Sequence, residues 1–483
     1  MGDKTHGGML VSGETAIKWV NDNYRYLSDI NDRIWEFAEV GLQEYKSAEL
    51  LASELEKAGF SVQRGVAGMP TAFVACWGSG RPKVGFLAEY DALPHLSQKA
   101  VPFQDPVRYD APGHGCGHNT YGTAVLGAVL GLKHEMEQDR LGGTIVFYGC
   151  PAEETLVGKV FMAREGLFDD LDCALTWHPS SLNVVSLGTS NAMNSAKFTF
   201  FGKAAHAGGS PDQGRSALDA VELMNIGVNY LREHVLQDAR LHYVITKGGG
   251  EPNVVPPEAQ VWYYVRAPWR EDVDAIYERV RKIAQGAALM TETTFKHEML
   301  VACYNMLSNR ALSDVMHKAL VRLGAPEWSE EELGFARKLA ESFSPGQKEA
   351  SIRNSGAPVE LLDQALHTGI AEPFDKDKVG HGSTDVSDVS WVTPTAQFGT
   401  ACEAIGAAGH SWQTVATSGM SIAHKGMALA AKVMAITGGE ALRDPELLKK
   451  ARAEFEKTLG GKKYQCAVPP EAKPPLDQLP KQG

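Results

Sequence analysis

Cys116 and His118 stand two positions apart in a glycine-rich segment, GHGCGHN, at residues 113–119. Thiolate and imidazole are good ligands for zinc and similar ions, and the glycines would let a loop curl around an ion. The same pattern also occurs in glycine-rich turns that bind nothing. A metal site is therefore predicted only if further ligands converge on this segment.

Two adjacent carboxylates, Glu153 and Glu154, follow the apolar run GGTIVFYGC. One carboxylate of such a pair can bind a metal while the other accepts a proton from water. The pattern leaves open which residue would take which role. It also fits a solvated, acidic helix start, where the helix dipole favours negative charge.

Other polar side chains occupy comparable positions. Glu89 and Asp91 end the run KVGFLAEYD, His178 follows CALTW, and His410 lies in GHSW. A single histidine in such a place is commonly structural. The carboxyl ends of strands in an open α/β sheet, however, face one crevice where ligands bind. Cysteine, histidine and glutamate side chains at that edge favour a metal hydrolase with enough ligands for two divalent ions.

The segments around these residues alternate between strands and helices. We expect helices at residues 42–59, 120–137, around Phe161, and at 309–323, 330–342 and 422–436, and strands at 71–77, 83–90, 142–150, 173–178 and 397–401. The turn GSGRP has the composition of a link between the first two strands. The alternation predicts an α/β fold, with a sheet covered on both faces.

The pattern changes near Met193. Strands are expected at residues 197–201, 242–246, 260–266 and 293–299, with helices at 216–236 and 273–287. This β-α-β-β-α-β order is the ferredoxin-like split unit. We predict an inserted domain at 193–305 within a discontinuous metal-binding domain formed by 1–192 and 306–483. Within the further insertion at 330–381, residues 343–381 are expected to be rich in loops, and the tail from about 462 to be irregular.

Composition limits the class of protein. The chain has 483 residues, of which 43% are hydrophobic and 22% are charged, and this composition excludes a wholly disordered chain. Its net charge of −12 argues against a general binder of nucleic acid or anionic membranes. The seven cysteines are scattered singly, so a disulfide framework is not expected. The N-terminal segment lacks the apolar run of a secretory signal. A cytoplasmic protein is therefore predicted.

Several motifs together resemble one enzyme family. The strings GHGCGHNTYGTAVLGAV, PAEET, WHP, GKAAHAGGSPDQGRSALDAV and NVVP occur in the order seen in the dimetal amidohydrolases, which include aminoacylases, carboxypeptidase G-type enzymes and auxin-conjugate hydrolases. The resemblance extends from about Trp35 to Met427. It implies a mixed-sheet, metallo-aminopeptidase-like catalytic domain with a ferredoxin-like lid or dimerisation domain.

The resemblance also implies roles for residues. In the cysteine-bearing branch of the family, the matching metal ligands are Cys116, His118, Glu154, His178 and His410. Glu153 would be the general base for attack of a metal-activated water, and Asp91 would orient a neighbouring group. The ions would be zinc or manganese, and cobalt also fits such ligands.

The family match gives three residues of the inserted domain a function. His206 matches a histidine that stabilises the oxyanion, often in the site of the partner subunit, and Asn253 and Arg266 match contacts to the substrate carboxylate. Without the resemblance, Arg266 would be read as a surface charge and His206 as a loop histidine. The resemblance implies a homodimer through the lid, and a heteromer with a related subunit stays open.

The sequence departs from the family in two places. Asn119 stands where many relatives have aspartate, and Thr384 stands where a glutamate is usual, so no role is assigned to Thr384. His114, His381 and His424 lie near the motifs and are interpreted as structural residues or as residues that support the metal ligands.

The implied substrate is an N-acyl amino acid with an aromatic acyl group, such as p-aminobenzoyl-glutamate. Alternatives are an indoleacetyl-amino acid or another N-acyl amino acid, deamination of an aromatic amine, or a subunit that serves mainly as a binding partner.

Overall fold

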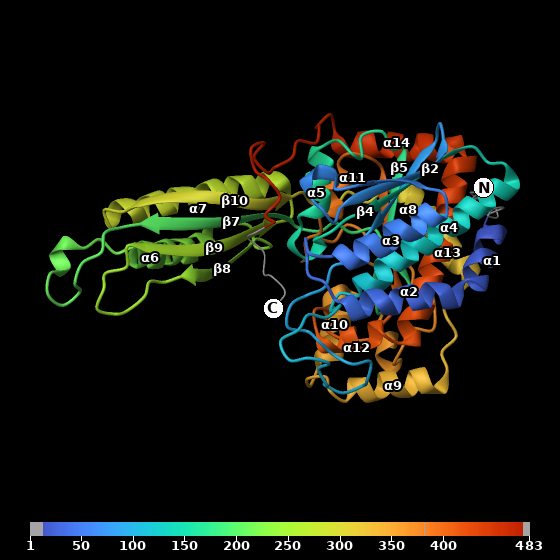
Figure 1. Ribbon diagram of the computed structural model, residues 1–483, viewed down its shortest axis with the longest axis horizontal. Coiled ribbons are helices and arrows are strands. Elements are labelled where there is room, and N and C mark those ends of the chain that lie inside the picture. The colour runs from blue at the N-terminus through green and yellow to red at the C-terminus, as the bar shows by residue number, and fades with distance from the viewer. Residues whose placement is uncertain (1–12, 381, 477–483) are drawn as a thin grey trace, which may run out of the picture.

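The computed structural model describes residues 13–380 and 382–476, which form a larger and a smaller lobe (Figure 1). The larger lobe is built on a seven-stranded sheet with the order β1-β2-β4-β3-β5-β11-β6. Its strands are β1 (Ser61–Arg64), β2 (Phe73–Ser79), β3 (Lys83–Ala88), β4 (Gly143–Gly149), β5 (Cys173–Ser180), β6 (Val184–Ser186) and β11 (Thr395–Ala401).

The centre of this sheet is parallel. Strands β4, β3, β5 and β11 run in the same direction, whereas β2 and β6 pair antiparallel to their neighbours. The central strands are almost continuously buried, as expected of parallel strands covered on both faces. The predicted mixed-sheet α/β fold is confirmed.

Helices cover both faces of this sheet, so neighbouring residues of β3 enter different cores. Phe86 packs among residues of α4 and α13, and Leu87 packs on the opposite face among residues of α5. The first face carries α1 (Glu14–Asp22), α2 (Tyr24–Phe37), α3 (Tyr45–Lys57), α4 (His118–Asp139), α8 (Arg310–Leu323) and α13 (Ser421–Arg443), and the second carries α5 (Gly158–Arg164) and α11 (Val386–Ser390).

The turn GSGRP links two strands, as expected, and β4 lies between these strands in the sheet. The segment 343–381 is rich in loops and also contains α10 (Gln347–Ser355) and a 3₁₀ helix (Val359–Asp363). Sequence reasoning missed α1 and α2, together with α14 (Pro445–Leu459). The other α-helices of the larger lobe are α9 (Glu330–Ala340) and α12 (Trp412–Ser418).

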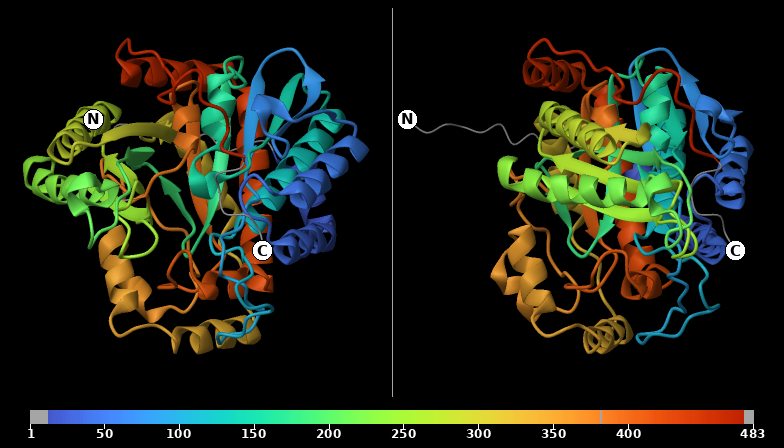
Figure 2. Two further views of the ribbon diagram at one scale, coloured as in Figure 1. Left: turned by 60° about the vertical axis from the view of Figure 1, so that its left-hand side comes forward. Right: turned by 90° about the vertical axis from the view of Figure 1, so that its left-hand side faces the viewer.

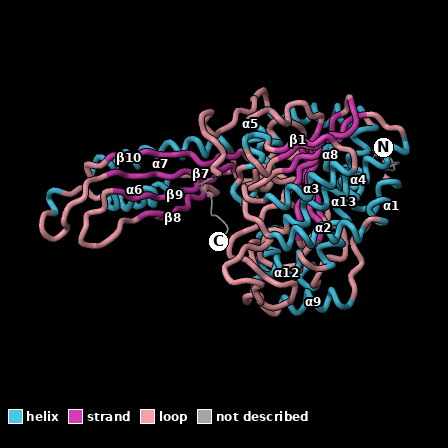
Figure 3. The backbone as a smooth tube through the Cα atoms, viewed as in Figure 1, coloured by secondary structure: helices cyan, strands magenta, loops and turns pink. Residues whose placement is uncertain are grey.

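The smaller lobe is a four-stranded antiparallel sheet with two helices on one face. Its order, β10-β7-β9-β8, is that of a ferredoxin-like unit. Figure 2 shows α6 and α7 side by side, and Figure 3 shows the strands extending away from the central sheet. The elements are β7 (Ala192–Phe201), α6 (Ala217–Leu231), β8 (Arg240–Lys247), β9 (Glu258–Ala267), α7 (Arg270–Met290) and β10 (Thr294–Cys303).

The two strands that enter and leave the smaller lobe are bonded to one side chain. Buried Arg270 donates to the carbonyl oxygens of Met193 on β7 and Cys303 on β10. The predicted domain boundaries at 192/193 and 305/306 stay a prediction.

Within the described ranges, none of the helices combines the length and apolar character needed to cross a membrane.

Candidate metal centre

The glycine-rich loop delivers Cys116 and His118 to the start of α4. Gly117, the residue before the helix, has a left-handed backbone (φ 73°), and a Cβ atom there would lie 2.9 Å from Cγ of Pro179. Glycine therefore lets the loop approach the end of β5 closely. The Sγ atom of Cys116 lies 3.4 Å from Nε2 of His178.

Hydrogen bonds orient both histidine rings. Nδ1 of His118 donates to Oδ1 of Asp91 at 2.8 Å, and Nδ1 of His178 donates to the carbonyl oxygen of Pro179 at 2.6 Å. When the rings are neutral, as in metal ligands, this leaves the lone pair of each ring on Nε2, which faces the cluster. Such bonding fixes the tautomer that a metal-binding histidine needs.

The carboxylate pair lies on a short turn after β4. Ala152 and Leu156, on either side of Glu153–Thr155, have left-handed backbone angles (φ 55° and 60°), and so does His410 (φ 55°). Non-glycine residues in this region cluster at functional sites. The N–H of Glu154 donates to Oδ2 of Asp91 at 2.9 Å, and its Oε2 lies 3.2 Å from Nε2 of His410.

These elements bring all five predicted ligands together. Ligand atoms of Cys116, His118 and His178 lie within 4.8 Å of one another, and so do those of Cys116, Glu154 and His410. Buried polar atoms are normally hydrogen-bonded, yet Nε2 of His118 and Oε1 of Glu154 have no such partner. Sulfur, nitrogen and oxygen donors with unused lone pairs fit a centre for divalent metal ions.

Burial makes the acids at this centre hard to ionise. It raises the pKa of Glu153 to about 7, with a further rise from the carboxylate of Glu89, and it raises the pKa of Glu154 well above its usual value. Burial, with the charge of Glu154, also raises the pKa of the Cys116 thiol. Divalent cations would reverse these shifts, because nearby positive charge favours the ionised forms.

A cavity of about 260 Å³ opens onto the cluster. Its walls include Glu153, the proposed ligands other than His118, and Tyr264 and Arg266 from β9 of the smaller lobe. The guanidinium of Arg266 lies 5.5 Å from the ring centre of Tyr264, and its Nε is buried without a hydrogen-bond partner. The smaller lobe thus supplies a cation to the cavity of its own chain.

His206 and Asn253 lie elsewhere. Both are exposed, in the loops that follow β7 and precede β9, and neither lines this cavity. The β7 arrow points away from the larger lobe in Figure 1, so these loops are at the far end of the smaller lobe. Their predicted roles stay predictions, which require the site of another chain or a different position of the lobe.

Several histidines near the motifs have other contacts. Nε2 of His114 bonds to the carbonyl of Ile34, and Nε2 of His424 bonds to Asp32. Asn119 donates to Asn31 and to the carbonyl of Ser418, away from the cluster. His381 lies outside the described residues.

Sequence reasoning missed Lys159, a buried cation beside the cluster. Nζ of Lys159 lies 2.6 Å from both Oε1 of Glu89 and Oδ1 of Asp385. A lone lysine inside the apolar helix GKVFMAR was the available signal, because a fully buried lysine requires a partner.

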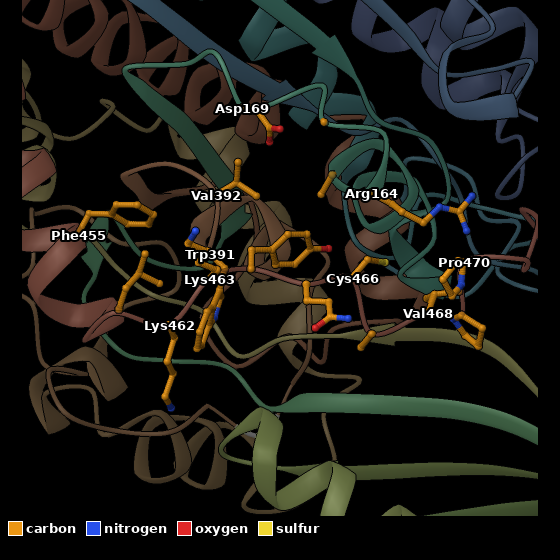
Figure 4. Close-up of a pocket in the computed structure, with 17 residues that line it drawn as sticks. Arg164, Asp169, Trp391, Val392, Phe455, Lys462, Lys463, Cys466, Val468 and Pro470 are labelled. Carbon is orange, nitrogen blue, oxygen red and sulfur yellow. The ribbon is translucent and has the colours of Figure 1, made fainter.

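A larger cavity, of about 680 Å³, lies beneath the C-terminal tail (Figure 4). Arg164, Trp391, Phe455 and Lys462 are among the residues around it. It contains none of the predicted site residues, so the smaller cavity is the candidate site.

Known proteins resemble this chain over nearly its whole length. Residues 189–291 match the peptidase dimerisation domain. The chain is 45% identical to a subunit of the p-aminobenzoyl-glutamate hydrolase of Escherichia coli, over 94% of this chain and 96% of the relative. It is 31% identical to the indole-3-acetyl-aspartic acid hydrolase of Enterobacter agglomerans, over 54% of this chain and 64% of that one.

A solved structure has the same fold. The YXEP protein of Bacillus subtilis, a dinuclear metal-binding peptidase from the M20 family, superposes with a TM-score of 0.56 at 16% identity, covering 88% of this chain and 99% of that one. Together with the strong similarity to the Escherichia coli subunit along nearly the whole chain, this confirms the resemblance inferred from the motifs. The chain belongs to the M20 family of metal-dependent amidohydrolases and peptidases, alongside that p-aminobenzoyl-glutamate hydrolase subunit.

Proposed function

We propose that this chain hydrolyses the amide bond of an N-acyl amino acid with an aromatic acyl group, and that p-aminobenzoyl-glutamate is its preferred substrate. The observation that carries the proposal is a cluster of five potential metal ligands, four of which line one cavity together with the carboxylate of Glu153 and the guanidinium of Arg266. The 45% identity to the Escherichia coli subunit supports the choice of substrate.

In this proposal the chain holds two divalent ions. The ligands are Cys116, His118, Glu154, His178 and His410, and zinc, manganese and cobalt all suit this donor set. When bound, such ions acidify a water and polarise the carbonyl of the amide. Asp91 keeps His118 and Glu154 in place through its two oxygens.

Glu153 performs the proton transfers. Its carboxylate lines the cavity beside the ligands without being assigned as one. It accepts a proton from the attacking water and returns that proton to the nitrogen of the leaving amine. The amide bond breaks as the nitrogen is protonated, and the acyl group leaves as a carboxylate.

Arg266 binds the carboxylate of the amino-acid part of the substrate. Its planar guanidinium can donate two parallel hydrogen bonds to a carboxylate, and Tyr264 supports it from the same strand. His206 and Asn253 act from the second subunit of a homodimer formed through the smaller lobe. A heteromer with a related subunit is the alternative, and we propose a cytoplasmic location.

The test combines a substrate panel with one substitution. Purified protein, reconstituted with metal, is expected to cleave p-aminobenzoyl-glutamate with a higher kcat/KM than indoleacetyl-aspartate or other N-acyl amino acids. Glu153→Gln is expected to lower kcat by about 100- to 10,000-fold, because the proton acceptor is lost, while the metal content is retained. Steady-state rates and elemental analysis measure both.

The matched control is Glu165→Gln, at the exposed end of α5, which should leave the rate unchanged. Full activity of Glu153→Gln, or of wild-type protein stripped of metal, would overturn the proposal. Better cleavage of indoleacetyl-aspartate would favour the auxin-conjugate alternative.

A further inference from the structure

The starting point is the buried ammonium of Lys159. Its side chain is fully inaccessible to solvent and is held between Glu89, at the end of β3, and Asp385, just before α11. Asp385 also accepts the backbone N–H of Lys159 at 2.8 Å. Removing one partner from such a buried charge network is costly, so these contacts hold the side chains in one arrangement.

Only one oxygen of Glu89 is used in this network. The other, Oε2, lies 3.3 Å from Nε2 of His118 and has no hydrogen-bond partner. In the neutral ring that a metal ligand requires, with Nδ1 donating to Asp91, Nε2 carries a lone pair and faces the carboxylate oxygen of Glu89. A cation between them would remove the repulsion.

The surroundings also require positive charge. Several acid groups gather here, among them Glu89, Asp91, Cys116, Glu153, Glu154 and Asp385, and Lys159 and Arg266 by themselves would not offset their charge when all are ionised. One carboxylate oxygen of Glu89 also lies within 4.8 Å of ligand atoms of His118 and Glu153, close enough for these atoms to share one ion.

We infer that Glu89 is an additional metal ligand, acting through Oε2 on the ion that His118 holds, and that Lys159 is the positioning residue that presents it. This inference rests on the proposed function, because it assumes that the cluster binds metal. Asp385 completes the arrangement by accepting a second hydrogen bond from Nζ of Lys159.

Cobalt binding tests the inference without relying on turnover. Metal-free protein is titrated with Co²⁺ against a chelator, and the visible absorption spectrum is recorded. Glu89→Gln is expected to lower the affinity for one of the two Co²⁺ ions by about 10- to 100-fold and to change the absorption spectrum. Lys159→Met is expected to change the spectrum in the same direction, because Glu89 is no longer held.

A second ion pair, in which the carboxylate is buried, provides the control. Glu332 and Lys425 form a contact of 2.6 Å on α9 and α13, and the Glu332 side chain is only 4% exposed. Glu332→Gln should leave cobalt affinity and spectrum as in the wild type. If Glu89→Gln does not fold, Glu89→Asp keeps the charge but withdraws the oxygen, and the same weakening is expected.

The outcomes separate the two proposals. Two ions bound with wild-type affinity and spectrum in the Glu89 variants would overturn the inference alone. A wild-type chain that takes up no cobalt would overturn the proposed function, and this inference with it.

Discussion

Asp388 is a buried carboxylate that connects α11 with two distant parts of the chain. It accepts the backbone N–H of Tyr304 at 3.0 Å and the hydroxyl of Tyr464, in the C-terminal tail, at 2.8 Å. Burial raises its pKa to about 7, although both hydrogen bonds favour the ionised form. The native state therefore binds a proton at pH values where the unfolded chain has lost it.

This proton makes stability depend on pH in a definite direction. The stability that this protonation contributes is fully present below the pKa of the carboxyl in the unfolded chain, near 4, and is lost as pH rises through about 7. Asp388→Asn removes the titration, so its free energy of unfolding should fall less than that of the wild type across this window, by up to about 1.4 kcal/mol per pH unit.

Urea unfolding between pH 4.5 and 7.5 measures the difference between the two proteins. Asp314→Asn, at an exposed position of α8, is the control and should follow the wild type. Parallel curves for wild type and Asp388→Asn would contradict the prediction.

The cluster of candidate ligands was predictable because sequence alone indicates where strands end. Glu154 and His178 each follow a buried run, and parallel strands bring such ends to one edge of the sheet. Lys159 and Asp385 were not predictable in this way. They are separated by more than two hundred residues, and no spacing or period indicates that they meet.

At the scale of elements, the join between the glycine-rich loop and α4 controls where the ligands lie. Gly117 needs a left-handed backbone and leaves no room for a side chain beside Pro179. Gly286 on α7 has open space where a Cβ would lie and has ordinary helical angles. The two glycines therefore should respond oppositely to the same substitution.

Gly117→Ala is expected to lower the free energy of unfolding by about 1–3 kcal/mol and to reduce the amount of bound metal, because the loop must shift. Gly286→Ala should stabilise the protein by about 0.5–1 kcal/mol, because alanine is the better helix residue. Chemical denaturation and elemental analysis report both effects. A stable, metal-replete Gly117→Ala protein would show that the loop tolerates a side chain.

Most elements of the smaller lobe were predictable, since their apolar pattern has a clear period. The order of the larger sheet was not. The insertion of β4 between β2 and β3, and of β11 between β5 and β6, depends on pairing between segments far apart in the chain. Local patterns carry no information about such partners.

At the scale of the molecule, the smaller lobe has an exposed apolar edge. On β8, the outer strand, the consecutive residues Tyr243, Val244 and Ile245 are 37%, 54% and 40% exposed. On the neighbouring α6, Ile226 and Tyr230 are 50% and 72% exposed. Unpaired edges and apolar patches of this kind favour association. The edge lies within the segment that matches a dimerisation domain.

Val244→Lys should weaken a homodimer formed at this edge, raising its dissociation constant at least about tenfold because a charge would be buried. Light scattering over a dilution series measures it. Val359→Lys, at a 67% exposed position of the larger lobe, is the control. An unchanged dimer in Val244→Lys would contradict this interface, and a monomeric wild type would favour assembly with a related subunit.

The position of β11 also has a consequence for how the protein is made. This strand, residues 395–401, fills the place between β5 and β6, which the ribosome produces more than two hundred residues earlier. The smaller lobe is continuous in sequence and can fold as soon as β10 emerges. The sheet of the larger lobe stays incomplete until β11 has been synthesised, and His410 is synthesised after β11. The complete set of proposed ligands can therefore assemble only near the end of synthesis, after the whole smaller lobe has been made.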